Sequence, residues 1–382
     1  MKAGRRRWVI SAGIVLLLLG IGGLLVAASG IIPIKASSGH WAVTRAFLQF
    51  AKNRSIETHS LTTKVPDLTQ HWQIVKGAGH YEIGCRPCHG APDLRVPGIA
   101  SAMLPNPPDL RRRVAMRDPA ELFYIVKHGL KFTGMPAWPS LERDDEVWAV
   151  VAFLLQLPKL DDSSYRQLVY GDLDRTPSSP ALEDLANDPI VPAIAQASCA
   201  RCHGLDGLGR GNAAFPRLAG QKRQYLLLAL RAYRDSARHS GIMEPIARSL
   251  SEDERIQLAG YYSSLTLAAP ASSGSAGSEA DEGSIARGES IARTGIPLKG
   301  VPSCMDCHGP GPHRRNAAYP DLAGQYGDYI VLQLELFASG RRGGSQFAHL
   351  MRYVASRLDA GEMRDVAAWY ASVGSTTGSG ER

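Results

Sequence analysis

Cysteine is absent from the sequence except in three short motifs, which together hold all six of its cysteines. A structural zinc site would need further Cys or His ligands at matching spacing, and no cysteine outside the motifs is there to supply them. A redox-active dithiol is typical of a βαβ context, and no βαβ pattern is visible. No segment is typical of a signalling module. The chemistry of the chain therefore has to come from the motifs themselves.

The three motifs share the pattern C-x-x-C-H, at Cys85–His89, Cys199–His203 and Cys304–His308. This pattern is the attachment signature of a c-type haem, in which two thiols one helical turn apart bond the two vinyl groups of a porphyrin. The histidine after the second thiol then binds the iron as its proximal ligand. Because it follows the cysteine directly, a haem suits the pattern better than a tetrahedral ion. We predict three covalent haems c, held by Cys85, Cys88 and His89, by Cys199, Cys202 and His203, and by Cys304, Cys307 and His308.

Charge is absent from the apolar run between Trp8 and Ile34, and a basic cluster of Lys2 and Arg5–Arg7 precedes it. The run is long enough to span a bilayer, and the basic cluster is expected to stay cytoplasmic. We therefore predict an inner-membrane anchor with the remaining chain on the periplasmic side. A cleaved signal peptide is the alternative, since Val26-Ala27-Ala28 resembles a small-residue cleavage site. Length favours the anchor.

The net charge is +7 and the isoelectric point is about 9.1. A basic balance could favour an acidic partner or anionic lipid, and it also simply keeps a protein soluble. We favour the second interpretation. Thioether bonds would use every cysteine, so no disulfide is available even in an oxidising compartment.

The leader between the anchor and the first motif contains one helical pattern. Its apolar residues recur at helical spacing and predict a helix near the membrane; they are Ala42, Val43, Ala46, Phe47, Phe50 and Ala51. His40, His59 and His71 also fall in the leader. We interpret them as surface histidines rather than iron ligands.

The first haem unit has clear helix signals on both sides of a methionine loop. Asp118 and Pro119 predict a capped helix start, and the apolar stretch from Asp144 to Leu157 predicts a helix that stops at Pro158. Met135 lies in the loop Thr133–Trp138, whose backbone Pro136 stiffens. We predict Met135 as the distal iron ligand, with core packing as the alternative.

The second and third haem units repeat one another, which points to duplication rather than one large core. Phe215–Gln221 matches Tyr319–Gln325, and Ala259–Tyr262 matches Ala367–Tyr370. Met243 and Met351 stand at equivalent positions, and we predict both as distal ligands. His349 is the competitor of Met351, and His239 is a weaker competitor of Met243. The methionines without equivalents are read as packing or surface residues: Met103, Met116, Met305 and Met363.

Composition divides the rest of the chain. Segments rich in Ser, Gly, Pro and acidic residues are typical of linkers and tails. The predicted organisation is an anchor at 1–35, a membrane-proximal leader at 36–73, haem units at 74–160, 190–268 and 284–373, linkers at 161–189 and 269–283, and a disordered tail at 374–382.

Each unit, with its C-x-x-C-H motif, methionine loop and closing aromatic-rich helix, resembles a class I cytochrome c domain. The first unit, with Gly134-Met135-Pro136-Ala137-Trp138, resembles single-haem cytochromes with a GMPA-type ligand loop. The other two are similar to the two halves of the cytochrome c4 family. The resemblance implies a mainly α fold of three tandem domains behind a transmembrane helix. It also implies that a loop proline carbonyl accepts the second N–H of each proximal histidine. Pro216 and Pro320 match that position clearly, and Pro108 matches it less clearly.

Met/His ligation fills both axial positions of the iron, which favours one-electron transfer over substrate binding. We therefore predict an electron-transfer protein, not an enzyme, in a bacterial respiratory chain. The expected partners are the membrane and a quinol-oxidising complex, a dehydrogenase, a terminal oxidase or a soluble cytochrome, with no nucleic acid. One alternative is the cytochrome subunit of a membrane-bound alcohol, aldehyde or sugar-acid dehydrogenase. A haem peroxidase is another, although it needs an iron with a free site.

Overall fold

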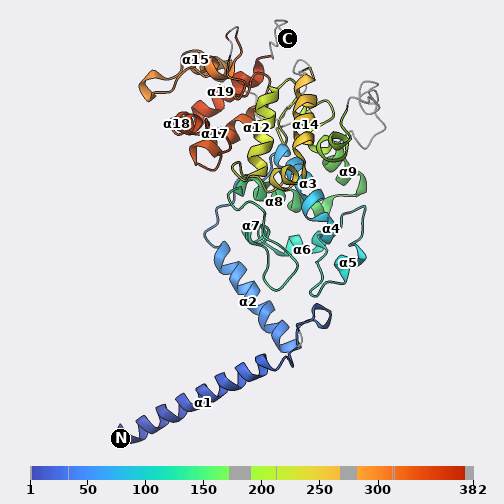
Figure 1. Cartoon of the computed structure of the whole chain (residues 1–382), viewed down its shortest axis with the longest axis vertical. Helices are drawn as coiled ribbons and strands as arrows, with labels where there is room; N and C mark the ends of the chain where they lie inside the picture. The colour runs from blue at the N-terminus through green and yellow to red at the C-terminus, as the bar shows by residue number, and fades with distance from the viewer. Residues whose placement is uncertain are drawn as a thin grey trace.

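Helices joined by loops make up the protein (Figure 1). The computed structural model describes residues 2–32, 34–171, 191–211, 213–266, 282–311, 313 and 315–374. Within these ranges the only strand-like features are two isolated bridges, Ala91 with Leu94 and Ile296 with Val301. The predicted mainly α class is therefore confirmed. The greater part of both predicted linkers and almost all of the predicted tail lie outside the described residues.

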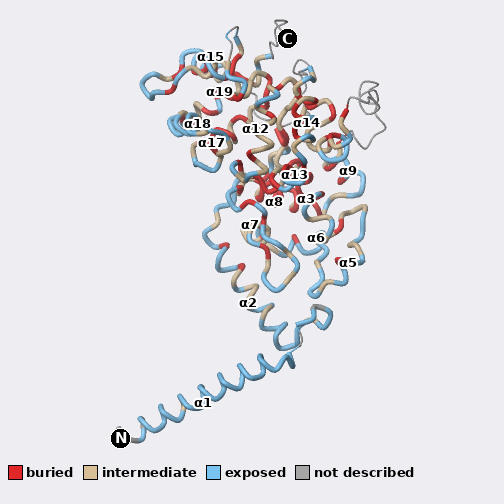
Figure 2. Tube along the Cα trace, viewed as in Figure 1, coloured by how far each residue is buried: buried red, intermediate tan, exposed pale blue. Residues whose placement is uncertain are grey.

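Helix α1 (Lys2–Ala28) extends away from the rest of the molecule (Figure 1). Its 27 residues give a length of about 40 Å at the usual rise. The part from Arg6 to Ala28 has a mean hydropathy of 2.7, and none of it is buried (Figure 2). By length and composition it is the one described helix that could cross a bilayer.

A short 3-10 turn η1 (Ala36–Ser38) leads to α2 (Ala42–Ser60), so the helix predicted in the leader is confirmed. The carboxyl-terminal half of α2 contacts the first haem unit, where Ile56 is buried and His59 stacks on Tyr124. Its amino-terminal half leaves Val43, Phe47 and Phe50 exposed. The three leader histidines are also exposed, as expected.

The first haem unit contains the two helices predicted around the methionine loop, and a further helix leads into Cys85. Its elements are α3 (His71–Gly84), α4 (Arg86–His89), α5 (Gly98–Ser101), α6 (Leu110–Arg113), η2 (Val114–Met116), α7 (Pro119–His128), α8 (Asp144–Gln156) and η3 (Leu157–Lys159). A capping box at Asp118 and Glu121 starts α7.

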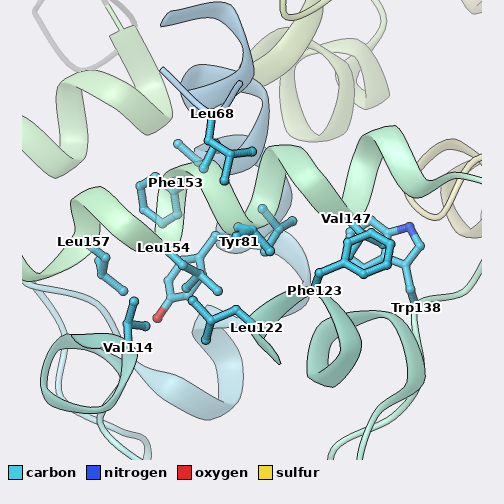
Figure 3. Packing of buried hydrophobic residues seen from close by; sticks show 14 of the residues in the cluster. Leu68, Tyr81, Val114, Leu122, Phe123, Trp138, Val147, Phe153, Leu154 and Leu157 are labelled. Carbon is cyan, nitrogen blue, oxygen red and sulfur yellow. The ribbon is translucent and has the colours of Figure 1, made fainter. Parts of the chain in front are cut away.

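Helices α3 and α8 cross at close range to form the core of this unit. A Cβ at Gly77 would lie only 1.9 Å from the carbonyl oxygen of Ala149, so this crossing requires glycine. Tyr81 of α3 and Leu154 of α8 point into the same apolar core (Figure 3), and the rings of Tyr81 and Phe153 lie 5.1 Å apart.

Helix α9 (Asp162–Tyr170) belongs to this core, although the sequence predicts a linker from residue 161 with at most one loosely held helix. Tyr165 and Val169 of α9 are fully buried, and the hydroxyls of Tyr165 and Tyr170 both donate to Glu82 on α3. The first unit therefore extends to about residue 171. The apolar residues four positions apart outweigh the charges that favoured a linker.

In both the second and the third unit, the motif helix is followed by three longer helices in the same order, whereas the elements around the motif helix differ. The second contains η5 (Ala195–Cys199), α11 (Ala200–His203), η6 (Gly209–Gly211), α12 (Arg223–Arg234), α13 (Met243–Ser249) and α14 (Glu252–Ser264). The third contains α15 (Glu282–Thr294), η7 (Pro297–Lys299), α16 (Met305–His308), α17 (Gly327–Ala338), α18 (Ala348–Ala355) and α19 (Ala360–Ser372). Each has its own buried apolar cluster. Figure 2 shows further buried residues where α3 and α8 of the first unit meet α13 of the second.

Candidate haem sites

Each C-x-x-C-H motif folds as a single turn of helix that ends at a glycine. The amide of His89 donates to the carbonyl of Cys85 (2.9 Å), and the amide of His308 donates to that of Cys304 (2.8 Å). Gly90, Gly204 and Gly309 follow the three histidines with φ of 71°, 76° and 72°. This left-handed conformation strains other residues, so the glycine lets the chain turn sharply away after the ligand. Sequence reasoning missed these glycines, although the triplet Cys-His-Gly occurs in all three motifs.

A proline carbonyl accepts a hydrogen bond from each proximal histidine, as the resemblance implies. The Nδ1 atoms of His89, His203 and His308 lie 3.0, 3.3 and 2.8 Å from the carbonyl oxygens of Pro108, Pro216 and Pro320, respectively. Because a carbonyl can only accept, Nδ1 carries the proton and Nε2 is left free for iron. The contact predicted less clearly, at Pro108, is present as well.

Burial lowers the pKa of all three proximal histidines, while the hydrogen bond to the proline carbonyl opposes that effect. These imidazoles are therefore neutral at pH 7. A neutral imidazole is the form that binds a metal.

Burial has the opposite effect on the pKa of four of the six motif cysteines. It raises the pKa of Cys85 and Cys199 to about 12 and that of Cys202 and Cys304 to about 11. Redox-active dithiols depend on a lowered pKa, so these sites do not resemble them. Among the described residues, no group of three or more His, Cys, Asp or Glu side chains could hold a metal ion. The zinc alternative thus has no additional ligands in this part of the chain.

The second and third motifs open into one cavity of about 330 Å³ between their units. The volume is typical of a pocket for a small organic group. His203 and Met243 line it from the second unit, and His308 and Met351 line it from the third. The competing histidines are elsewhere: His239 pairs with Glu244 at 3.7 Å, and the side chain of His349 is exposed.

Met135 of the first unit is half-buried in the loop between α7 and α8. Its amide donates to Oγ1 of Thr133 (3.1 Å), and its carbonyl accepts from the amide of Leu130 (3.2 Å). The loop is also tied to α7 by the amide of Trp138, which donates to the carbonyl of Lys127. Met103, read from sequence as a packing or surface residue, lies next to this loop, with its sulfur 3.2 Å from the position of a Cβ on Gly134.

Two arginines and two tyrosines line the shared cavity at equivalent positions of the repeat. Arg238 donates to the hydroxyl of Tyr329 (3.3 Å), and Arg342 donates to the hydroxyl of Tyr225 (3.2 Å). Burial lowers the pKa of Arg342, and the neighbouring charge of Arg238 lowers it further. Two arginines this close together are stabilised by a nearby anion. A bound haem would supply two carboxylates.

Unsatisfied polar atoms also fit a bound group at this place. Arg217 lines the cavity, and its Nε and Nη1 atoms are buried with no hydrogen-bond partner. Buried polar groups of this kind normally have a partner. The cysteine pairs, the cavity and these donors together fit haem, and Arg217, Arg238 and Arg342 would hold its carboxylates.

Two glutamines join the second and third units around an approximate two-fold axis. Gln221 donates to the carbonyl of Asp321 (2.9 Å) and accepts from its amide (3.0 Å). Gln325 does the same with the backbone of Arg217, at 3.1 and 3.0 Å. Sequence reasoning recorded both glutamines in the repeat but assigned them no role. A residue repeated identically outside the motif was the available signal.

The first unit also reaches the shared cavity. Lys76 and His80 of α3, together with Arg143 and Glu146 beside and within α8, line it from the side of the second unit. Sequence reasoning named none of them. They have no counterpart in the repeat, so only the folded chain reveals them.

Comparison with known proteins places these units among cytochromes. Residues 73–154 match the family described as cytochrome c oxidase, cbb3-type, subunit III, and residues 191–266 match the family described as cytochrome c. The thiosulfate dehydrogenase electron acceptor of Thiomonas intermedia is 38% identical over 179 residues, which cover 46% of this chain and 78% of that protein.

Two cytochromes c4 are also similar. That of Pseudomonas aeruginosa is 31% identical over 188 residues, which cover 49% of this chain and 88% of that protein. The solved structure of the Acidithiobacillus ferrooxidans protein is 31% identical and matches 46% of this chain and 99% of its own, with a TM-score of 0.40.

Proposed function

Because this chain belongs to the class I c-type cytochromes and has cytochrome c4-like units, we propose that it is a membrane-anchored tri-haem carrier of single electrons. Its relatives are electron carriers or acceptors, so the chain is an electron-transfer protein rather than an enzyme. Covalent attachment of haem c is a property of this family. The presence of three haems is our proposal, and it rests on three motifs that share one local geometry.

The proposed axial pairs are His89 with Met135, His203 with Met243 and His308 with Met351. For the second and third units, the support is the cavity that both members of each pair line. When bound, an iron with nitrogen and sulfur axial donors would take up and release one electron with little rearrangement.

The chain's own residues hold and shield that group. The proline carbonyls fix the imidazoles, the arginines of the cavity would offset carboxylate charge, and the apolar clusters would exclude water. The single observation that carries the proposal is the convergence of Cys, His and Met from two units on one cavity.

The proposed role is in a respiratory chain, between a quinol-oxidising complex or a dehydrogenase and a terminal oxidase or soluble cytochrome. The similarity of residues 73–154 to subunit III of cbb3-type oxidase supports a direction towards an oxidase. Helix α1 supports an anchor in the inner membrane with the haem units in the periplasm. The exposed residues Val43, Phe47 and Phe50 of α2 are consistent with a helix that lies near lipid.

A first experiment is to purify the full chain from cells that mature c-type cytochromes and to measure iron and haem per chain. We expect three haems that acidified acetone does not extract. Met135→Ala, Met243→Ala and Met351→Ala should each remove one of three low-spin Met/His signals in low-temperature EPR spectra. His349→Ala should remove none. A colourless protein, or the loss of a signal in His349→Ala instead of Met351→Ala, would contradict the respective assignments.

The anchor has its own test. Membranes washed with high salt should retain the protein, detergent should release it, and amino-terminal sequencing should find the apolar segment intact. Release by salt together with a new amino terminus near Ala28 would instead support a cleaved signal peptide.

A second candidate function is an electron acceptor of a periplasmic dehydrogenase. The similarity to the thiosulfate dehydrogenase electron acceptor favours it, and it is related to the alcohol, aldehyde or sugar-acid dehydrogenase alternative. Rapid reduction of the purified protein by a thiosulfate dehydrogenase with thiosulfate, and slow reduction by a quinol-oxidising complex, would favour this candidate. The reverse order of rates would favour the first.

A further inference from the structure

Glu146 is a fully buried carboxylate of the first unit, and it faces the methionine loop of the second unit. It lies in the first turn of α8 and is only 2% exposed. Its Oε2 accepts from the amide of Gly241 at 2.7 Å, and its Oε1 accepts from the hydroxyl of Ser240 at 2.7 Å. These are hydrogen bonds between residues that are almost a hundred positions apart in sequence.

The same carboxylate also holds the methionine loop of its own unit. Trp138, three residues after Met135, donates from Nε1 to Oε2 at 3.1 Å. Arg143 forms an ion pair with Oε1 at 3.1 Å and donates to the carbonyl of His239 at 2.6 Å. Glu146 therefore receives four donors, two from each unit. The charge of Arg143 holds the pKa of Glu146 below its usual range, although burial alone would raise it.

Ser240 transmits this contact to the predicted ligand of the second unit. Its Oγ accepts from the amide of Met243 at 3.1 Å, and its amide donates to Glu244 at 2.9 Å. A continuous path of hydrogen bonds and short chain segments thus runs from Met135 through Trp138, Glu146 and Ser240 to Met243.

The residues along this path are closely packed. A Cβ on Gly241 would lie 2.2 Å from Nε1 of Trp138. On α3, a Cβ on Gly79 would lie 2.9 Å from the ring of Phe215 and 3.8 Å from the sulfur of Cys202. Helix α3, which ends at Gly84 directly before the motif cysteine Cys85, therefore also passes close to Phe215 and Cys202 of the second unit.

We propose that Glu146 is a positioning residue that joins the methionine loops of the first and second haem units, so that the two iron sites are set as one structure. This inference rests on the proposed function, because it takes Met135 and Met243 as iron ligands. Hydrogen bonds to an ionised acceptor are stronger than neutral ones, and three of them, together with the ion pair to Arg143, fix both loops against α8. Among the described residues, none of the third unit takes part in these contacts with Glu146.

The test is Glu146→Gln in the full haem-loaded chain, with Glu142→Gln as the matched control. Both substitutions replace a carboxylate by an amide, but Glu142 is exposed. An amide offers one acceptor oxygen, so two of the four donors at Glu146 would face an NH₂ group. The measurements are the long-wavelength absorption band of Met-ligated ferric haem, the low-temperature EPR spectrum and the three midpoint potentials.

We expect Glu146→Gln to weaken the Met-ligation signals of two of the three centres and to shift their potentials, while the third centre and Glu142→Gln behave as wild type. Assignment of the centres comes from the single methionine variants described above. Wild-type signals at all three centres in Glu146→Gln would overturn the proposal. Equal changes at all three would also overturn it, because they would indicate general destabilisation.

Two further variants keep the test decisive if Glu146→Gln does not fold. Ser240→Ala removes the link to Met243 and should change the second centre, while Trp138→Phe removes the link to the first loop and should change the first centre. Unchanged spectra in both would overturn the proposal. A wild-type protein that lacks Met-ligation signals would instead contradict the proposed function itself, so the two failures are distinguishable.

Discussion

The second and third haem units derive from one repeat, but their methionine helices have different surroundings. In the second unit, Gly241 packs under Trp138 of the first unit. The equivalent position in the third unit is His349, which is exposed, and its neighbours Leu350 and Tyr353 are about half-exposed. The second site is therefore internal, with a neighbour on each side, and the third is terminal. The repeat specifies the haem pocket, and the residues that vary between its copies specify the neighbours.

The largest difference should come from removing a haem from either unit. Replacing Cys199 and Cys202 by serine, or Cys304 and Cys307 by serine, should each lower the haem content from three to two. A group that binds the folded state contributes its binding energy to folding. Because the first and third units both wall the second site, its loss should lower the melting temperature of the whole chain more than loss of the third.

Calorimetry of the two double variants measures this difference, with iron content as the check on haem loading. Equal melting temperatures for the two variants would mean that the second unit is no more central than the third.

The features that could be predicted from the sequence are local ones, whereas those that could not be predicted depend on long-range contacts. The motifs, the α7 start at Asp118 and the α8 stretch from Asp144 were predictable because caps and periodicity act over a few residues. Glu146 was not, since an acid in the first turn of an apolar helix is ordinary on electrostatic grounds alone. Its partners Ser240 and Gly241 lie in another unit, and no local pattern records such a contact.

The place of helix α9 in the core of the first unit could not be predicted from local sequence either. Its charges resemble those of a linker, and the burial of Tyr165 depends on Glu82, more than eighty residues earlier. The approximate two-fold contact of Gln221 and Gln325 was visible as repetition but became interpretable only when the two copies faced each other.

The boundary between the first and second units should also respond to pH through His80. Its side chain is 4% exposed and lies 5.7 Å from the ring of Trp138. Burial lowers the pKa of His80 to about 4 from an ordinary value of 6.5, and the charge of Glu146 opposes this effect in part. The unfolded chain therefore takes up this proton at a higher pH than the folded chain. Its contribution to stability is intact above pH 6.5 and is lost as the pH falls towards 4.

Wild-type protein should lose up to about 3 kcal/mol of unfolding free energy through this group between pH 7 and pH 4. In His80→Gln, this part of the pH dependence should vanish. His349→Gln, at the exposed position of the third unit, should keep the wild-type slope. Urea unfolding of the three proteins at several pH values tests the prediction, and parallel slopes for wild type and His80→Gln would contradict it.

The close approach at Gly241 predicts a smaller effect. Gly241→Ala places a methyl group against the indole of Trp138, and overpacking of this kind costs about 1–3 kcal/mol. His349→Ala, at the equivalent position of the third unit, should change stability by less than about 0.5 kcal/mol. Chemical denaturation of the two variants measures the contrast, and similar values would show that the two methionine helices have equivalent surroundings after all.

The smallest expected effect concerns the boundary at which the second and third units are alike. Gln221→Ala leaves the amide and carbonyl of Asp321 without their partner, and Gln325→Ala does the same to Arg217. Each loss should cost about 1 kcal/mol or slightly more, because the backbone groups are only half-buried. The approximate two-fold symmetry requires the two costs to be nearly equal, whereas Gln49→Ala on the exposed surface should cost almost nothing. Clearly unequal costs would contradict the approximate two-fold symmetry of this boundary.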